Sequence, residues 1–549
     1  MTQTDTLNNT DRNYIAEWEA RLREIEMLEF PANFRELLEN AALQFGKRNA
    51  LRMIDAEESL SFEELREQVN RLAASLYTAG VKKGSRVAVL LPNCIEFPVS
   101  WLAIAQLGAV MVPVNTAYTG SELDYVMNDA EVSFLIVHDS LLAAFDSMSA
   151  RPAALTDDRV IVVGDPAELP YGSYAAMLTS GDPGFRSPEA LHQDDLLNIQ
   201  YTSGTTGFPK GCMQHQRYWI VLGCSVAALS TDIESLLTDH PYFYMDPQWQ
   251  LVWALYSGAT VNIAPAMSSS RFWQRVRDYD IHWAWFPVPI LNFPETPGED
   301  QHPIRHFHAG AISAANILRA ERRFGIPVRS TYGMTEIGAG TLVPDEIPNN
   351  SVLETVGLRA PFRELRIVDE NGVDVPDGTA GELIVRGDGV FLGYYKQPEA
   401  NESGFYDDWF RTGDMFIRDE LGYYHIVGRF KDMIRRSAEN ISAMEVEYVV
   451  MDMPEVDEAA AIPVADDYRG EEVKIYVRLA EGVTQNDCPP QKIIEHCAAH
   501  LAGFKIPRYY AYVDSFERTP SDKVAKHLLT EGIDDLRDGS YDRVDDKWR

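Results

Sequence analysis

A glycine- and hydroxyl-rich segment at residues 201–211, YTSGTTGFPKG, has the residue types that wrap a polyphosphate. Its glycines let consecutive backbone N–H groups approach an anion without interference from a Cβ, and its Ser and Thr hydroxyls add further donors. Lys210 supplies a point charge for a terminal phosphate. The string is not a Walker-type P-loop, because Pro209 precedes the lysine and Gly211 follows it. The segment therefore predicts a phosphate-binding loop of another kind.

Two further segments carry groups that suit the rest of a nucleotide. Residues 330–336, STYGMTE, place an aromatic ring, a hydroxyl and a carboxylate in one short stretch, which could stack on a base, contact a phosphate and hold a divalent cation. Residues 409–414, WFRTGD, end in a carboxylate beside a glycine, a common acceptor for the two hydroxyls of a ribose. Each segment has an ordinary alternative, a strand end or a simple turn. Their interpretation as a nucleotide site depends on their occurring together.

The elements around these segments predict an α/β fold. Between residues 34 and 80 the apolar side chains fall at helical spacing, and residues 86–91, RVAVLL, are typical of a buried strand. Short β-branched runs and helices then alternate, which indicates a doubly wound α/β sheet. The glycine-rich segment follows a predicted strand at residues 197–201. Open α/β sheets bind their ligands at such carboxyl ends of strands.

The domain organisation is predicted from a change of pattern near residue 355. Short apolar runs separated by Asn-Gly and Asp-Gly turns indicate a small antiparallel β subdomain over residues 354–428. We expect a large N-terminal domain, residues 1–430, that contains this subdomain and the doubly wound layers. A small mobile α+β C-terminal domain is expected over residues 431–549. A chain of 549 residues, 45% of them hydrophobic, can fill at least two such cores.

The composition excludes several classes of partner. A formal net charge of -34 opposes broad electrostatic attraction to nucleic acid or to anionic lipid, so local donors must hold any anionic ligand. The five cysteines form no CxxC pair, which suits a reducing compartment and argues against structural zinc. The N-terminus lacks the order of a signal peptide, and no run of about eighteen apolar residues occurs. We therefore expect a cytoplasmic protein without a membrane or nucleic-acid partner.

Six segments, taken in order, resemble the signature motifs of the adenylate-forming superfamily, which comprises acyl-CoA synthetases, adenylation domains of peptide synthetases and luciferases. The chain looks most like the crotonobetaine/carnitine-CoA ligase branch. The segments are residues 201–211, 308–312 (HAGAI), 330–336, 409–414, 428–434 (GRFKDMI) and 518–526 (RTPSDKVAK). The resemblance implies an AMP-forming acid–CoA ligase with ATP, Mg²⁺ and coenzyme A, the last as a substrate.

The resemblance also implies roles for individual residues. The implied ATP- and AMP-binding residues are Thr202, Ser203, Gly204, Thr205, Thr206, Gly207, Lys210, Gly310, Ala311, Tyr332, Gly333, Thr335, Asp414, Arg429 and Lys523. The implied catalytic residues are Thr202, Thr335, Glu336 and Lys523. Glu336 is the implied Mg²⁺ ligand, and Lys431 is the implied hinge between the domains.

The sequence does not specify a single acid substrate. The pocket implied by the resemblance contains Tyr244, Asp246, Trp249, Trp285, Gly338 and Gly340. Aromatic rings with one acid could hold a quaternary ammonium by cation–π attraction, whereas the same rings could simply be core. We expect a short or small acid, and both a betaine-like and an aromatic one stay open.

Two departures from the family pattern keep other functions open. Asp522 replaces the usual glycine before Lys523, and Ser437-Ala438 stand where a glycine pair is common. The alternatives are a stand-alone adenylation enzyme that loads a carrier protein in trans and a nucleotide-binding sensor with decayed catalysis. A homodimer also stays open.

Overall fold

A computed structural model describes residues 3–166, 170–202, 209–310, 312–347, 352–429, 433–436, 439–466, 469–501, 503–518 and 523–549. The chain divides into two compact units. The larger unit includes Met1–Gly204, Phe208–Leu365 and Val385–Asp408, and the smaller unit includes Arg366–Ile384 and Trp409–Arg549. The predicted domain boundary at residues 430 and 431 lies outside the described residues and stays a prediction.

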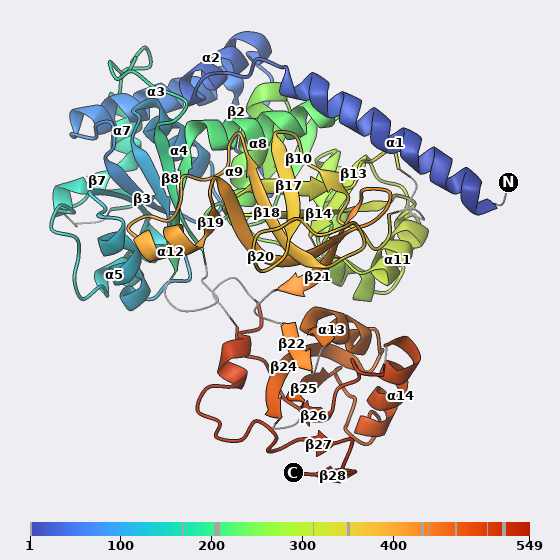
Figure 1. Ribbon diagram of the computed structural model, residues 1–549. Helices are drawn as coiled ribbons and strands as arrows, with labels where there is room; N and C mark the ends of the chain where they lie inside the picture. The colour runs from blue at the N-terminus through green and yellow to red at the C-terminus, as the bar shows by residue number, and fades with distance from the viewer. Residues whose placement is uncertain are drawn as a thin grey trace. The chain divides into compact units, whose positions relative to one another are not determined.

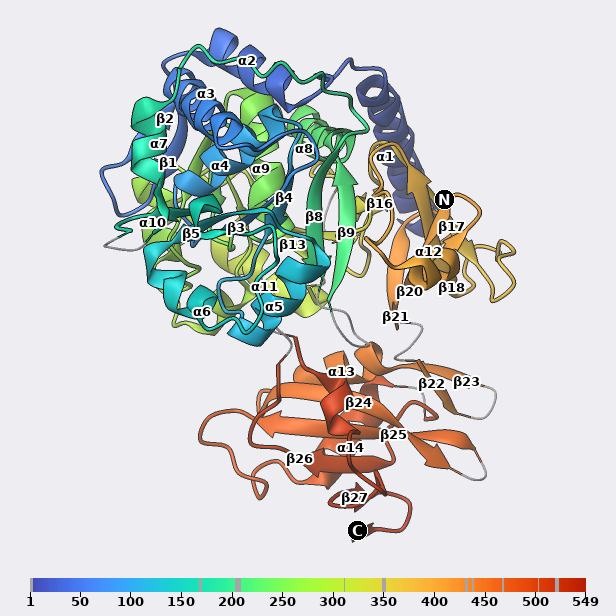
Figure 2. The same cartoon turned by 90° about the vertical axis from the view of Figure 1, so that its left-hand side faces the viewer.

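A seven-stranded sheet in the larger unit carries the glycine-rich segment. Its strand order is β7-β6-β5-β3-β4-β8-β9, and Figure 2 shows β8 and β9 side by side. The strands are β3 (Arg86–Leu90), β4 (Val110–Pro113), β5 (Phe134–His138), β6 (Val160–Val163), β7 (Gly172–Ser173), β8 (Leu196–Thr202) and β9 (Lys210–His215). All neighbours pair in parallel except β8 and β9, which form an antiparallel hairpin.

A second, nine-stranded sheet in the larger unit has the order β16-β15-β14-β13-β12-β10-β11-β1-β2. Its central strands pair in parallel, whereas β15, β16 and β2 pair antiparallel at the two edges. The strands are β1 (Asn49–Met53), β2 (Ser59–Ser61), β10 (Ser235–Thr238), β11 (Thr260–Ile263), β12 (Trp283–Trp285), β13 (His306–Gly310), β14 (Val328–Met334), β15 (Gly338–Leu342) and β16 (Leu358–Arg359).

Helices cover these sheets (Figure 1). They are α1 (Gln3–Glu26), α2 (Phe34–Phe45), α3 (Phe62–Thr78), α4 (Glu96–Gln106), α5 (Gly120–Asp129), α6 (Leu142–Asp146), α7 (Tyr174–Ser180), α8 (Gln216–Leu229), α9 (Met245–Ser257), α10 (Phe272–Asp278), α11 (Ala314–Phe324) and α12 (Pro398–Ser403). Local chemistry sets their ends: a Ser61/Glu64 capping box starts α3, and Gly258 at φ 78° ends α9. No described helix has the length and apolar character that a membrane crossing requires.

The core of the larger unit is aromatic and fixes β8. The indoles of Trp101, Trp219 and Trp253 are fully buried in one cluster with residues of both sheets. Trp101 Nε1 donates to Asn198 Oδ1 at 2.9 Å, which ties α4 to the strand that precedes the glycine-rich segment. Asn198 in turn donates to Gln248 Oε1 at 2.7 Å. A satisfied polar chain in an apolar core therefore positions the strand that leads into the predicted phosphate loop.

The antiparallel sheet expected near residue 355 is present. Its order is β17-β18-β20-β19, with β21 paired to β20. The strands are β17 (Arg363–Val368), β18 (Gly381–Gly387), β19 (Phe405–Tyr406), β20 (Trp409–Arg418) and β21 (Tyr424–Arg429).

The rest of the smaller unit is an α+β fold around a seven-stranded sheet of order β23-β22-β25-β26-β27-β28, with β24 paired to β25 (Figure 1). Its elements are β22 (Met433–Arg436), β23 (Glu439–Ser442), α13 (Ala443–Met451), β24 (Val456–Asp466), β25 (Gly470–Leu479), α14 (Pro490–His500), β26 (Tyr509–Tyr512), β27 (Tyr541–Asp542) and β28 (Lys547–Trp548). The predicted fold class, doubly wound α/β layers with an antiparallel sheet and an α+β part, is confirmed.

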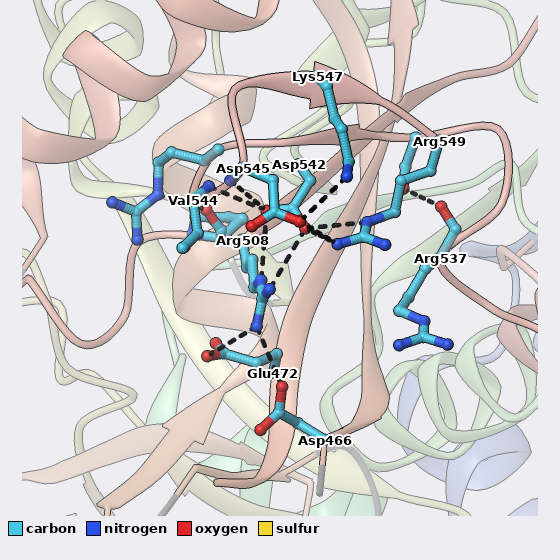
Figure 3. A network of polar contacts seen from close by, with 12 residues as sticks. Asp466, Glu472, Arg508, Arg537, Asp542, Val544, Asp545, Lys547 and Arg549 are labelled. Atoms are coloured by element: carbon cyan, nitrogen blue, oxygen red, sulfur yellow. Dashed lines mark hydrogen bonds and ion pairs between the residues drawn. The ribbon is translucent and has the colours of Figure 1, made fainter. Parts of the chain in front are cut away.

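A polar network holds the last strands of the smaller unit onto β26 (Figure 3). Asp542 has no exposed surface, and its carboxylate accepts hydrogen bonds from Arg508 at 3.2 and 3.3 Å and from Arg549 at 2.9 and 2.6 Å. Arg508 also pairs with Asp466 at 3.0 Å. A buried carboxylate needs such compensation, so Asp542 is the centre that joins β24, β26, β27 and the C-terminal residue.

Candidate active site

The β8–β9 hairpin brings the two described ends of the glycine-rich segment together. Thr202 and Lys210 are partners in its antiparallel ladder, and the Thr202 hydroxyl donates to the Lys210 carbonyl at 3.4 Å. Gly211 is required by space, because a Cβ there would lie 2.6 Å from Ile199 Cγ2. Both predicted residues therefore lie at the base of the loop, at the carboxyl end of β8. The predictions for Ser203, Gly204, Thr205, Thr206 and Gly207 fall outside the described residues.

Glu336, the predicted metal ligand, is a buried carboxylate with 6% of its surface exposed. The hydroxyl of Tyr394 donates to Glu336 Oε1 at 2.7 Å. The ring of the same tyrosine lies 5.0 Å from Lys210 Nζ. Burial, with further contributions from Glu336 and Cys212, raises the pKa of Tyr394, so the phenol stays protonated as the donor. The structure thus joins Lys210 and Glu336, which are far apart in sequence, through Tyr394.

The donor chemistry of this site fits a Mg²⁺ ion. Mg²⁺ in nucleotide sites is commonly held by one or two carboxylates and by phosphate oxygens instead of by an all-protein cage. Glu336 offers one hard oxygen ligand, and the described residues contain no group of three or more His, Cys, Asp or Glu side chains that could form a cage. Glu336 would hold the ion, and the nucleotide would supply the remaining ligands.

The backbone on either side of Glu336 is held by buried donors. The Thr335 carbonyl accepts hydrogen bonds from the Tyr218 hydroxyl at 2.9 Å and from Gln214 Nε2 at 2.8 Å. The Ile337 carbonyl accepts two from the guanidinium of Arg363, at 2.9 and 2.7 Å. Burial raises the pKa of Tyr218 and lowers the pKa of Arg363 to about 10. Both groups keep their protons at neutral pH and remain donors to this segment.

Glycines shape the surroundings of Tyr332, the residue predicted to lie against adenine. Tyr332 is buried on β14, and a Cβ at Gly340 would lie 3.1 Å from its ring. A Cβ at Gly333 would lie 2.4 Å from the Gly338 carbonyl oxygen, so Gly333 permits the close pairing of β14 and β15. Gly310 ends the neighbouring strand, opposite Thr331, and is exposed. The prediction for Ala311 falls outside the described residues.

A cavity lies at the ends of β10, β12 and β13. Its lining residues are Asp239, His240, Met267, Trp285, Phe286, Pro287, Val288, Ala309 and Gly310. Two predicted residues, Trp285 for the acid and Gly310 for adenine, therefore face the same space. Among the described residues that line it, none is Lys or Arg.

Asp246 and a tryptophan cluster lie beside this cavity. Trp249 contacts Trp285 with ring centroids 6.3 Å apart and donates from Nε1 to Asp246 Oδ1 at 3.4 Å. Burial raises the pKa of Asp246, and the nearby His240 opposes this shift. Burial likewise raises the pKa of Asp239, against the influence of His240 and Arg275. The cavity is therefore flanked by two carboxyl groups whose burial favours the neutral acid, while a positive charge nearby favours the carboxylate.

Two other residues predicted for the acid pocket, Tyr244 and Gly338, are held by different neighbours. The carbonyl of Tyr244 accepts from Gln248 Nε2 at 3.0 Å, so the polar chain that fixes β8 also fixes the start of α9. Gly338 adopts φ 67°, and a Cβ there would lie 3.4 Å from Leu222 and from Arg363. A substitution at Gly338 would thus act first on the support of the Glu336 segment.

The remaining predicted residues belong to the smaller unit. Asp414 is buried, and its backbone pairs with Arg429 in the β20–β21 ladder, so the two residues implied for the ribose are partners in one hairpin. Lys523 is exposed on the segment after β26. Lys431, Ser437-Ala438 and Asp522 fall outside the described residues.

Sequence reasoning missed four residues that hold the site: Tyr394, Tyr218, Gln214 and Arg363. The first follows a glycine at position 393, which signals a turn and gives no indication of a contact with Glu336. Gln214 and Tyr218 lie in the run 214–218, QHQRY, where several polar side chains stand together, so nothing in the sequence singles these two out.

Comparison with known proteins gives consistent matches. Residues 38–395 match the family described as AMP-binding enzyme, and residues 445–523 match its C-terminal domain. The oxalate–CoA ligase of Arabidopsis thaliana is 30% identical, over 90% of this chain and 97% of its own. The crotonobetaine/carnitine–CoA ligase of Salmonella typhi is 28% identical, over 90% and 98%. The ATP-bound structure of MatB from Rhodopseudomonas palustris superposes with a TM-score of 0.79 at 28% identity, over 91% and 98%.

Proposed function

The chain belongs to the AMP-binding enzyme family, and on that premise we propose that it is an AMP-forming acid–CoA ligase for a small carboxylic acid. The observation that carries the proposal is the joining of Thr202, Lys210 and Glu336 in one site of the larger unit. These side chains supply a hydroxyl, a cation and a carboxylate, the groups needed around a metal-bound triphosphate. The two relatives compared above are themselves named as CoA ligases.

The proposed reaction has two steps. An oxygen of the acid's carboxylate attacks the α-phosphorus of ATP, the bond to the β-phosphate oxygen breaks, and pyrophosphate leaves. The sulfur of CoA then attacks the acyl carbonyl carbon, the bond to AMP breaks, and the thiol proton passes to solvent. Negative charge grows on phosphoryl and carbonyl oxygens in both steps, so fixed cations and N–H donors supply most of the acceleration.

Each residue then has a defined task. Lys210 and the Thr202 hydroxyl bind phosphate oxygens at the base of the loop, and Glu336 would hold Mg²⁺, which neutralises phosphate charge when bound. Asp414 accepts hydrogen bonds from the ribose hydroxyls. Lys523 contacts the acid's carboxylate and the α-phosphate in the first step.

The side chains around the cavity favour an acid whose far end is neutral or cationic. Two carboxyl groups, Asp239 and Asp246, flank a space whose described lining includes no Lys or Arg. A second carboxylate on the substrate, as in oxalate, would find no Lys or Arg partner among the described lining residues. A quaternary ammonium group would gain from Asp246 and from the rings of Trp249 and Trp285. A betaine-like acid is therefore our preferred substrate, and a small neutral aromatic acid is second.

The test is pyrophosphate release from ATP and Mg²⁺ with short aliphatic, aromatic, dicarboxylic and betaine-like acids, each with and without CoA. We expect release with the betaine-like acids, enhanced by CoA, together with formation of acyl-CoA. Release that ignores CoA would point instead to a carrier-protein acceptor. An absence of release across the panel would contradict ligase activity and favour a nucleotide sensor.

A matched pair of variants tests the charge argument. Asp246→Asn keeps the shape but removes the carboxyl group that a cationic substrate would hold in its ionised form, so it should raise KM for a betaine-like acid about tenfold or more. It should leave KM for a neutral aromatic acid unaffected. Asp129→Asn is the control, because the carboxylate of Asp129, at the end of α5, accepts a hydrogen bond from Tyr201 of β8 and does not line the cavity. Equal effects of Asp246→Asn on both acids would contradict a cationic substrate while leaving the ligase proposal intact.

A further inference from the structure

We propose that Tyr394 is a positioning residue that sets Glu336 and Lys210 in register for a metal-bound triphosphate. The inference rests on the proposed function, because it takes both partners of Tyr394 as parts of the nucleotide site. Tyr394 belongs to none of the six segments that identified the site from sequence. It lies in Val385–Asp408, and both of its partners lie in Phe208–Leu365, so all three residues belong to the larger unit.

The hydroxyl of Tyr394 controls the orientation of the Glu336 carboxylate. Its hydrogen bond occupies Oε1 at 2.7 Å, and a carboxylate has two oxygens with about four lone-pair sites in all. The bond restricts rotation of the carboxylate, the group that would bind the cation. A ligand that is already oriented binds its ion without the entropy cost of ordering a flexible side chain.

The ring of Tyr394 acts on the other partner. Lys210 Nζ lies 5.0 Å from the ring centroid, within the range of a cation–π contact. One rigid side chain therefore touches the cation at the base of the loop and the carboxylate of the metal site. It fixes the spacing between the positive and the negative group on which a phosphate and its metal ion would dock.

The backbone around Tyr394 is built to be rigid. Asn401 accepts a hydrogen bond from Tyr394 N at 2.7 Å and donates one to Tyr394 O at 2.8 Å. Gly393, at φ 111°, permits this clamp, because a Cβ there would lie 2.9 Å from Asn401 Oδ1. A tyrosine held at both its backbone groups can transmit its position to the residues that its side chain touches.

The same segment is bonded to both elements that it aligns. Leu392 N donates to Met213 O at 2.7 Å and Tyr395 N donates to Gly211 O at 2.8 Å, which adds residues 392–395 to the edge of β9. Phe391 N donates to Glu336 O at 2.9 Å. The strand that begins with Lys210 and the backbone of Glu336 are thus joined to the segment that carries Tyr394.

The neighbouring tyrosine provides a matched control. Tyr395 also donates its hydroxyl to a glutamate oxygen at 2.7 Å, namely Glu131 Oε2, on an exposed surface. Tyr394→Phe and Tyr395→Phe change neighbouring residues, and each removes a hydroxyl that donates to a glutamate oxygen. They differ in which glutamate is released.

The experiment measures the dissociation constant of ATP by calorimetry, with Mg²⁺ and with EDTA, for the wild type and both variants of the full chain. Thermal unfolding verifies that each variant is folded. We expect Tyr394→Phe to weaken binding of Mg²⁺-ATP about tenfold, the usual effect of losing a hydrogen bond to a charged group, and to leave metal-free ATP within about twofold. Tyr395→Phe should leave both constants unchanged.

Other results would overturn the positioning role, the proposed function or the cation–π contact. If Tyr394→Phe binds Mg²⁺-ATP like the wild type, or weakens both forms of ATP equally, the positioning role is wrong. If the wild type itself binds ATP no better with Mg²⁺, the proposed function fails and this inference falls with it. Tyr394→Leu, which also removes the ring beside Lys210, should additionally weaken metal-free ATP. Unchanged binding of metal-free ATP by this variant would overturn the cation–π part of the proposal.

Discussion

Replacement of Asp542 by alanine should loosen the last strands of the smaller unit. Asp542 has no exposed surface, and its carboxylate accepts from the guanidiniums of Arg508 and Arg549 (Figure 3). It also accepts backbone N–H bonds from Val544 at 2.9 Å and Asp545 at 3.2 Å. Alanine removes all of these at once and leaves two guanidiniums facing the vacated space.

The size of the effect follows from what the arginines retain. Removing one partner of a buried ion pair costs about 3–5 kcal/mol. Here each guanidinium keeps another carboxylate, Asp466 at 3.0 Å for Arg508 and Asp545 at 2.6 Å for Arg549. The cost should therefore lie at the lower end, at about 3 kcal/mol, which raises local opening about a hundredfold.

Amide hydrogen exchange of the intact protein, read on peptides covering β26 to β28, measures this opening. Exchange there should accelerate about a hundredfold, while peptides of β3 to β6 in the larger unit stay unchanged. Asp535→Asn is the control, because Asp535 pairs locally with Arg537 on the surface at 2.7 Å. Unaltered exchange in Asp542→Ala, or equal acceleration in the control, would refute the reasoning.

Three further predictions concern other parts of the chain. Lys523→Ala should slow ATP–pyrophosphate exchange by about two to three orders of magnitude, with conversion of supplied acyl-adenylate to acyl-CoA retained, and normal exchange would exclude Lys523 from the first step. Gly181→Ala should lower the free energy of unfolding by about 1–3 kcal/mol, because a Cβ there would lie 2.0 Å from the Arg71 carbonyl oxygen. The thermal midpoint should fall accordingly, and an unchanged midpoint would contradict this contact. Burial alone would lower the pKa of His306, but Asp345 at 2.8 Å and Asp232 at 3.2 Å raise it above 6.5. Protonated His306 should therefore stabilise the larger unit fully below about pH 6.5, and this stabilisation should be lost as the pH rises through the raised pKa. In the wild type the urea unfolding midpoint should fall over that pH range, and His306→Gln should not show this fall.

The glycine-rich segment was predictable because its chemistry is local. The predicted strand before it, residues 197–201, is the inner part of β8, and the loop begins at the carboxyl end of that strand. Short-range composition fixes such features, since glycines, hydroxyls and a lysine must all contact one ligand. The α/β alternation was predictable for the same reason, because each β-branched run signals its own strand.

The residues that hold the site were not predictable in this way. Tyr394 contacts Glu336 across 58 positions, and β1 pairs with β11 across some two hundred, with no local signal for either. Helix α1 was not predicted, although Trp18, Leu22 and Ile25 are buried at helical spacing and could have signalled it. The positions of residues in the smaller unit relative to a nucleotide, such as Asp414 and Lys523, stay predictions.

The tryptophans beside the cavity give the protein an optical property of its own. Trp249, Trp253 and Trp283 lie with ring centroids 5.4 to 6.0 Å apart, and Trp285, which lines the cavity, lies 5.5 Å from Trp283. Indoles at such separations share their excited states, so they should produce a circular-dichroism couplet and exchange excitation energy. Any molecule that enters the cavity would disturb the outermost ring, and through it the emission of the whole group. The chain thus carries a built-in, label-free spectroscopic probe for whatever acid it binds.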